Sequence, residues 1–237
     1  MSIDISQIPV QPEPFEFDLK HFARALRPGN LVNVVALGSS TTAGEGGIAP
    51  YPSRLQALLT AQYSTVTINV INRGVGGEEA PAELKRMPID VIDQKPSLVI
   101  WQVGTNAVWQ PADQHPPTFD ATIDAIQEGV RQLLATDATD VILMDLQYVP
   151  AVLTSAKRPV ADRMVAAIRD IARKAGVNVF RRFALMEAWH EVEGISFDRM
   201  VDLTDQYRLH DSDWATARLS QTLMDQIASV VKRSPTV

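Results

Sequence analysis

Short apolar runs alternate with segments of helical period along most of the chain, and this alternation restricts the possible folds more than any other feature of the sequence. Runs typical of buried strands occupy residues 31–37, 66–72, 98–103, 140–147 and 177–180. Segments in which apolar residues recur every three or four positions occupy residues 53–63, 120–136, 159–176 and 215–232. Strands that are apolar throughout and separated by helices indicate a parallel sheet covered on both faces.

The helical segments support the same arrangement. The apolar residues of segment 120–136 fall on one stripe that would pack against a sheet, namely Ile123, Ile126, Val130 and Leu133. Gly176 ends the next segment, where a left-handed C-terminal cap is expected. The sequence therefore predicts an α/β protein with a doubly wound, five-stranded parallel sheet in a three-layer α/β/α sandwich.

Length and composition narrow the possibilities further. The 237 residues fit one domain, and we expect residues 1–29, with four of the prolines, to form an arm before a single domain at 30–237. The absence of cysteine excludes thiol nucleophiles, disulfides and metal–thiolate sites. A net charge of -6 with both signs interspersed argues against nucleic acid as a partner, and the chain lacks the run of about 18 apolar residues that predicts a membrane span. The N-terminus lacks a secretory signal, but a signal could have been removed, so the compartment stays open.

Small and polar residues follow three of the predicted strands. They form the segments 38–44 (GSSTTAG), 73–78 (RGVGGE) and 104–106 (GTN). Ligands of open parallel sheets bind beyond the carboxyl ends of the strands, so these segments are expected to lie together at a site. Such residues allow close approach of backbone N–H groups to a ligand oxygen. The glycine patterns of phosphate-binding loops are absent, which makes a nucleotide site the weaker interpretation.

Ser40 and His210 are the candidate nucleophile and base. Alone, a serine at this position is more often a helix cap or a loop hydroxyl than a nucleophile. A serine nucleophile needs a base, and His210 directly precedes the last helical segment, where a loop could return to the site. The other histidines suit surface or packing roles, since His21 lies in the arm, His115 in a proline-rich loop and His190 in an acidic stretch. Of these, His115 is the runner-up, because it follows the third predicted strand and could line a substrate pocket.

With these residues the chain resembles the SGNH (GDSL) hydrolase superfamily, esterases and lipases built on a flavodoxin-like α/β/α sandwich. The family's first block, Gly-Asp-Ser-x-Thr-x-Gly, stands here as GSSTTAG at 38–44. The resemblance implies that Ser40 is the nucleophile and His210 the general base. It further implies an oxyanion hole formed by the N–H of Ser40, the N–H of Gly77 and the side-chain amide of Asn106, with no metal and no organic cofactor.

Three positions depart from the family pattern. Ser39 replaces the aspartate of the first block, and Ala107 follows Asn106 where the family usually has aspartate. The final block is usually Asp-x-x-His, yet Tyr207 stands three residues before His210, and tyrosine is not ionised at neutral pH.

The group that orients His210 is therefore open. Asp205, five residues earlier, is our catalytic candidate, because two extra loop residues would let its carboxylate reach Nδ1. Asp202 is a weaker candidate, and a Ser-His dyad without a carboxylate is the remaining possibility. Asp211 and Asp213 are explained as N-terminal caps of the last helix and as favourable negative charge at its positive end.

The expected function is hydrolysis of carboxylic esters through an acyl-enzyme, with a small-molecule or carbohydrate ester carrying a short acyl or acetyl group as substrate. Trp109, after the third strand, could stack on a sugar or acyl group, and Tyr148, after the fourth, could also face the site. The alternatives are a non-hydrolytic carbohydrate-binding protein of the same fold and an O-acyltransferase with the same Ser-His chemistry. The sequence does not indicate the oligomeric state.

Overall fold

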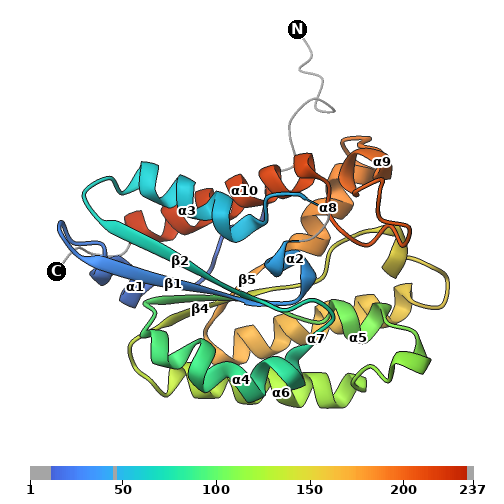
Figure 1. Ribbon diagram of the computed structural model, residues 1–237, viewed down its shortest axis with the longest axis horizontal. Coiled ribbons are helices and arrows are strands. Elements are labelled where there is room, and N and C mark those ends of the chain that lie inside the picture. Colours follow the sequence, from blue (N-terminus) through green and yellow to red (C-terminus); the bar gives the residue numbers. More distant parts are fainter. Residues whose placement is uncertain (1–11, 45–46, 234–237) are drawn as a thin grey trace, which may run out of the picture.

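The computed structural model describes residues 12–44 and 47–233, and its centre is a sheet of five parallel strands (Figure 1). The strands are β1 (Leu31–Gly38), β2 (Thr67–Gly74), β3 (Leu98–Gln102), β4 (Asp140–Met144) and β5 (Asn178–Phe180). Their order across the sheet is β2-β1-β3-β4-β5, and each neighbouring pair is parallel. This is the flavodoxin-like order, so the predicted fold is confirmed.

Helices cover both faces of the sheet and complete the three layers. Figure 1 shows α3 (Tyr51–Gln62), α8 (Arg182–Glu191) and α10 (Asp213–Arg233) on one side, and α4 (Ala80–Asp90), α6 (Phe119–Leu134) and α7 (Arg158–Ala175) on the other. Shorter helices are α1 (Lys20–Ala25), α2 (Ser40–Ala43), α5 (Thr105–Trp109) and α9 (Phe197–Met200), with 3-10 turns at Ile92–Gln94, Ala112–Gln114 and Pro150–Val152. Within the described residues, no helix combines the length and apolar character needed to cross a membrane.

The core lies where the apolar helix stripes meet the central strands. Ile126 and Leu133 of α6 are fully buried, as is Ile142 of β4, so the predicted stripe packs on the sheet. Gly176 follows α7 with φ of 70°, the left-handed cap that was expected. Besides the short helices, α4 and α8 lie outside the predicted segments: α4 contains Pro88, and the ten residues of α8 have little helical periodicity in their apolar residues.

Residues 12–29 lie against the domain rather than apart from it. Phe15, Leu19 and Phe22 are buried in the same core as the sheet. The side chain of Asn178 in β5 exchanges two hydrogen bonds with the backbone of Phe17, at 3.0 and 2.8 Å. Residues 1–11 of the expected arm lie outside the described residues.

The strand order reverses between β1 and β3, because the chain runs from β1 to β2 at one edge of the sheet and then returns to add β3, β4 and β5 on the other side of β1. A crevice for ligands is expected beyond the carboxyl ends of strands at such a point. The three polar segments of the sequence follow β1, β2 and β3, so the fold brings all three to this edge.

Candidate active site

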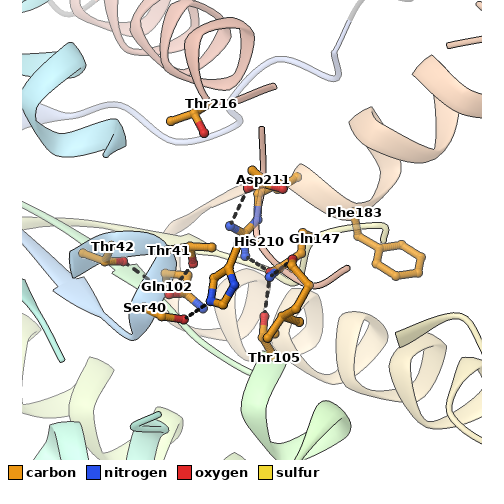
Figure 2. Close-up of polar contacts among 12 residues, drawn as sticks. Ser40, Thr41, Thr42, Gln102, Thr105, Gln147, Phe183, His210, Asp211 and Thr216 are labelled. Atoms are coloured by element: carbon orange, nitrogen blue, oxygen red, sulfur yellow. Dashed lines mark hydrogen bonds and ion pairs between the residues drawn. The ribbon is translucent and has the colours of Figure 1, made fainter. Parts of the chain in front are cut away.

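Ser40 is the first residue of α2, a one-turn helix that begins directly after β1. The buried Gln102 at the end of β3 holds this turn, because its Oε1 accepts hydrogen bonds from the N–H and hydroxyl of Ser39, both at 3.1 Å. The hydroxyls of Thr41 and Thr42 donate to the same oxygen at 3.2 Å (Figure 2). The first N–H groups of a helix have no partner within it, so the Ser40 N–H suits an oxyanion donor.

Strand β2 holds the other end of the turn. Asn72 Nδ2 donates to the carbonyl of Thr42 at 2.8 Å, and the backbone of α2 passes directly over Gly74. A Cβ at Gly74 would lie 2.1 Å from the backbone nitrogen of Ala43, so only glycine fits there. The segment after β2 thus positions the nucleophile turn as well as carrying Gly77.

His210 reaches Ser40 from the loop before α10. Its Nε2 lies 3.0 Å from Ser40 Oγ, and its Nδ1 lies 2.8 Å from Asp205 Oδ2 (Figure 2 shows the Ser40–His210 contact). An ionised carboxylate only accepts, so Nδ1 carries the hydrogen and Nε2 is left to accept from the Ser40 hydroxyl. The tautomer follows from this hydrogen-bond network.

Asp205 also fixes the loop that carries His210. Its Oδ2 accepts the backbone N–H groups of Leu209 and His210 at 2.8 and 2.9 Å, and its Oδ1 accepts that of Tyr207 at 2.9 Å. Burial raises the pKa of Asp205, but the backbone hydrogen bonds and the His210 ring outweigh it and hold the pKa below its ordinary value. The side chain of Asp202 instead accepts from Thr204 in its own turn. The structure therefore brings Asp205 to His210, and not Asp202.

Of the two aspartates expected to cap the last helix or to place negative charge at its N-terminus, Asp213 lies in the first turn of α10, as the charge argument expected, but neither is the capping residue. Ser212 is the residue that caps it, since its Oγ accepts from Ala215 N at 3.1 Å. Asp213 is the first residue of α10 and pairs with Arg54. Asp211 is buried, and its Oδ2 lies 3.7 Å from Nη1 of Arg182.

Gly77 and Asn106 belong to one hydrogen-bonded group between the segment after β2 and α5. Asn106 Nδ2 donates to the carbonyl of Glu78 at 2.7 Å, and Gln110 Nε2 donates to that of Gly77 at 2.8 Å. An amide group has two N–H donors, so one donor of Asn106 remains for a substrate oxygen. Gly77 has φ of 79°, a left-handed conformation that favours glycine.

Glu79 is the buried anchor of this side, and the sequence analysis missed it. Its Oε1 accepts from Gly104 N and Ala80 N at 2.8 and 2.9 Å, and its Oε2 accepts from Asn106 N and Ala107 N at 3.0 and 3.2 Å. Four donors leave no room for a proton on either oxygen. The available signal was position, since Gln102 is the last residue of β3 and Glu79 directly follows the polar segment 73–78.

Glu83, one turn further along α4, completes a buried acidic pair. Its Oε2 accepts from Trp101 Nε1 at 2.6 Å, and its Oε1 has no partner among the described residues. Burial raises the pKa of Glu83 well above its ordinary value, and the negative charge of Glu79 raises it further. The pKa of Glu79 is also raised by burial, against the effect of its backbone donors. Because those donors favour the charged form of Glu79, Glu83 is the member that keeps a proton.

Trp109 and Tyr207 form an aromatic pair that joins α5 to the His210 loop. Their ring centroids are 5.2 Å apart with an interplanar angle of 71°. Tyr207 is 55% exposed, and Lys157 Nζ donates to the carbonyl of Trp109 at 2.7 Å. The residue that replaces the family's aspartate thus turns outward at the edge of the site.

Tyr148 lies apart from this surface. It is 4% exposed, its ring stacks on Phe197, and its hydroxyl pairs with Glu191 Oε1 at 3.0 Å. Its role in substrate binding stays a prediction, to which the buried ring and the paired hydroxyl give no support.

A cavity of about 30 Å³ adjoins Ser40 and His210 on the side of α3 and α10. Its lining includes Tyr51, whose hydroxyl has no hydrogen-bond partner among the described residues. The space suffices for one or two water molecules. Across residues 12–44 and 47–233, no group of three or more His, Asp or Glu side chains converges as metal ligands would.

Comparison with known proteins identifies the family to which the chain is similar. The model of the non-GDSL lipase-like family matches residues 6–233. An acetylxylan esterase from Geobacillus stearothermophilus is 25% identical over 154 residues, which cover 60% of this chain and 68% of that one.

Solved structures share the fold. A catalytic serine mutant of an acetylxylan esterase from G. stearothermophilus superposes with a TM-score of 0.69 at 21% identity, covering 83% of this chain and 94% of that one. Aspartate and histidine mutants of that enzyme are also described as catalytic. A protein described as a GDSL-like lipase from Parabacteroides merdae gives a TM-score of 0.70 at 14% identity, over 83% and 95% of the two chains.

Proposed function

Because this chain belongs to the non-GDSL lipase-like family, a family of SGNH-type carboxylic ester hydrolases, we propose that it is a serine esterase that removes acetyl or other short acyl groups from carbohydrate esters. The observation that carries the proposal is the line of contacts from Ser40 Oγ through His210 to the Asp205 carboxylate, at 3.0 and 2.8 Å. A nucleophile, a base and an orienting carboxylate in hydrogen-bond contact are what acyl transfer to serine requires.

The reaction proceeds in two steps. His210 Nε2 takes the proton of the Ser40 hydroxyl as Oγ bonds to the ester carbonyl carbon, and the carbonyl oxygen becomes an oxyanion. The oxyanion accepts from the N–H groups of Ser40 and Gly77 and from Asn106 Nδ2. The C–O bond to the alcohol then breaks, and His210 returns the proton to the leaving oxygen. A water molecule repeats the sequence on the acyl-enzyme, releases the acid and restores Ser40.

The substrate class follows from what surrounds these groups. Trp109 and Tyr207 form the aromatic edge of the site, and aromatic rings suit the apolar faces of sugars. The cavity beside Ser40 and His210, about 30 Å³, suits a short acyl group better than a long chain. The relatives described as acetylxylan esterases agree with this choice. They give no support to the non-hydrolytic binding protein or the O-acyltransferase.

A fluorophosphonate probe with peptide mapping tests the nucleophile. We expect labelling at Ser40 and release of acetate from acetylated xylo-oligosaccharides, both lost in Ser40→Ala and His210→Ala. Ser53→Ala, at an exposed serine of α3, serves as the control and should keep both. Labelling elsewhere, or acetate release by Ser40→Ala, would refute the mechanism. Faster hydrolysis of p-nitrophenyl octanoate than of p-nitrophenyl acetate would refute the short-acyl preference.

A further inference from the structure

We propose that Gln147 and Arg182 form a buried brace that fixes the His210 loop relative to α5, the helix that carries Asn106. Neither residue touches the reacting atoms of the proposed mechanism, so both are positioning residues. The inference rests on the proposed serine esterase function, because it concerns how two parts of that site are kept in register.

Gln147, just beyond the end of β4, is bonded to both parts at once. Its Oε1 accepts from the Thr105 hydroxyl at 2.9 Å, and its Nε2 donates to the carbonyl of Leu209 at 3.2 Å. Thr105 directly precedes Asn106, and Leu209 directly precedes His210. One side-chain amide therefore joins the neighbour of an oxyanion donor to the neighbour of the base, and Figure 2 shows Gln147 between Thr105 and His210.

Arg182 fixes the side chain of Gln147 by a hydrogen bond. Its Nη2 donates to Gln147 Oε1 at 2.7 Å, and its Nε donates to the carbonyl of Asp145 at 3.1 Å. Its Nη1 lies 3.7 Å from the carboxylate of Asp211, the residue after His210. The loop is thus held on both sides of His210, through the Leu209 carbonyl and through the Asp211 side chain.

The brace is buried throughout, which argues for a role beyond stability. Gln147 and Arg182 are each 1% exposed, and Thr105 is 2% exposed. Placing a guanidinium and an amide in the interior costs desolvation that packed apolar side chains of similar volume would avoid. Polar groups with several partners do, however, fix relative orientation more closely than apolar contacts, and misplacement of a catalytic group by about 1 Å can cost about 10²-fold in rate.

The sharpest test uses Thr105, because Thr105→Val removes one link of the brace with little change in shape. Gln147 Oε1 keeps its bond from Arg182 in this variant, so no buried oxygen is orphaned. We expect kcat for p-nitrophenyl acetate to fall by about 10-fold or more, with little change in KM, because only the placement of the oxyanion helix is affected. Thr105→Ser restores the hydroxyl and should recover most of the loss.

Gln147→Leu removes both links and should lower kcat by about 10²-fold. It also leaves the Thr105 hydroxyl, the Leu209 carbonyl and an Arg182 N–H without these partners, so it needs a control at another buried glutamine. Gln226→Leu provides one, because Gln226 is buried in α10 and its Nε2 donates to the backbone of Glu13, away from the site. Gln226→Leu should lower the free energy of unfolding while kcat stays close to that of the wild type.

The outcomes separate the two proposals. If wild-type protein hydrolyses the ester and Thr105→Val keeps its kcat, or if Gln147→Leu loses no more kcat than Gln226→Leu, the brace is refuted and the esterase proposal stands. If wild-type protein neither hydrolyses esters nor is labelled at Ser40, both proposals fall. A low kcat in Thr105→Val that Thr105→Ser restores supports the brace.

Discussion

Two carboxylates, Glu79 and Asp205, each hold one part of the candidate site by accepting several backbone N–H groups. Glu79 holds the part with the oxyanion candidates, and Asp205 holds the loop with His210. Glu79 accepts four backbone N–H groups and ties the segment after β2 to α5. Asp205 accepts three backbone N–H groups and the His210 ring. Glu79 lies inside the domain beside another acid, whereas Asp205 lies in a surface loop with the exposed Tyr207.

This difference in burial reverses the effect on the pKa. Burial raises the pKa of Glu79, while the donors around Asp205 outweigh burial and lower its pKa. The difference in burial also predicts different effects of substitution on stability and on rate in the two parts of the site. The oxyanion side is part of the packed edge of the sheet, so changes there should affect stability as well as rate. The base side is a partly exposed loop, so changes there should affect rate more than stability.

The largest effect is expected on the base side, from Asp205→Asn. An asparagine whose NH₂ group takes the place of Oδ2 would donate to His210 Nδ1 and favour the tautomer with hydrogen on Nε2, while its oxygen keeps the Tyr207 N–H. The same NH₂ group would face the backbone N–H groups of Leu209 and His210 and could not accept from them. That tautomer cannot accept the Ser40 proton, and we expect kcat/KM for p-nitrophenyl acetate to fall by about 10⁴-fold. The unfolding free energy should also fall, but by less than in Glu79→Gln, because the two N–H groups that lose their acceptor are only partly buried. Asp202→Asn, in the same loop, should leave kcat/KM close to wild type. A loss of less than about tenfold in Asp205→Asn would support the dyad instead.

Asn106→Ala is expected to have the next largest effect, on the oxyanion side. Its amide would donate to charge that develops only as the reaction proceeds, so kcat should fall by about 10²- to 10³-fold while KM changes little. Steady-state kinetics with p-nitrophenyl acetate measure this, and Asn69→Ala, at an exposed residue of β2, is the matched control. An increase in KM at unchanged kcat would show that Asn106 binds the ground state and is not an oxyanion donor.

Glu79→Gln tests whether the buried side links stability to rate. The glutamine would present an NH₂ group to two of the four backbone donors, which leaves them unpaired and costs about 1–3 kcal/mol of unfolding free energy for each such group. Asn106 would lose its backbone anchor, so kcat should also fall. Urea denaturation and kinetics on the same samples decide the comparison. Equal stability of Glu79→Gln and wild type would show that the four contacts do not anchor this side.

The sequence predicts the fold and the strand-end residues because both depend on short-range patterns. Apolar runs and helix stripes are set by burial, so the five strands and the stripe of α6 could be predicted from spacing alone. Ser40, Gly77 and Asn106 follow strands, and parallel strands bring their carboxyl ends together. Helix α4 could not be predicted in this way, because Pro88 lies inside it and its buried positions include Glu83.

The residues that hold the site are harder to predict, because their contacts join distant segments. Gln102 and Gln147 are polar residues at strand ends, but their partners lie about 60 or more positions along the chain in Ser39 and Leu209. Asp205 could only be proposed as one of three possibilities. The five-residue spacing works because the backbone turns back at Arg208, which has φ of 53° in the left-handed region. Non-glycine residues seldom adopt that conformation, and the sequence carries no signal for it.

The smallest predicted effect concerns the acid beside Glu79, and it tests the sign of the pKa shift. The folded-state pKa of Glu83 is raised, so its contribution to stability is fully present below the ordinary value of 4.5 and is lost as the pH rises through the raised pKa. Glu83→Gln resembles the protonated side chain and can keep the Trp101 contact, so it should match wild type at low pH and become the more stable protein as the pH rises. The difference in unfolding free energy between the variant and wild type should change by at most about 1.4 kcal/mol per pH unit, because one proton is involved.

Urea denaturation from about pH 5 to about pH 9 measures this difference, and Glu16→Gln at an exposed position should show no such divergence. A variant less stable than wild type at high pH would mean that Glu83 is charged in the folded protein, and the contrast between the protonated Glu83 and the ionised Asp205 would fail.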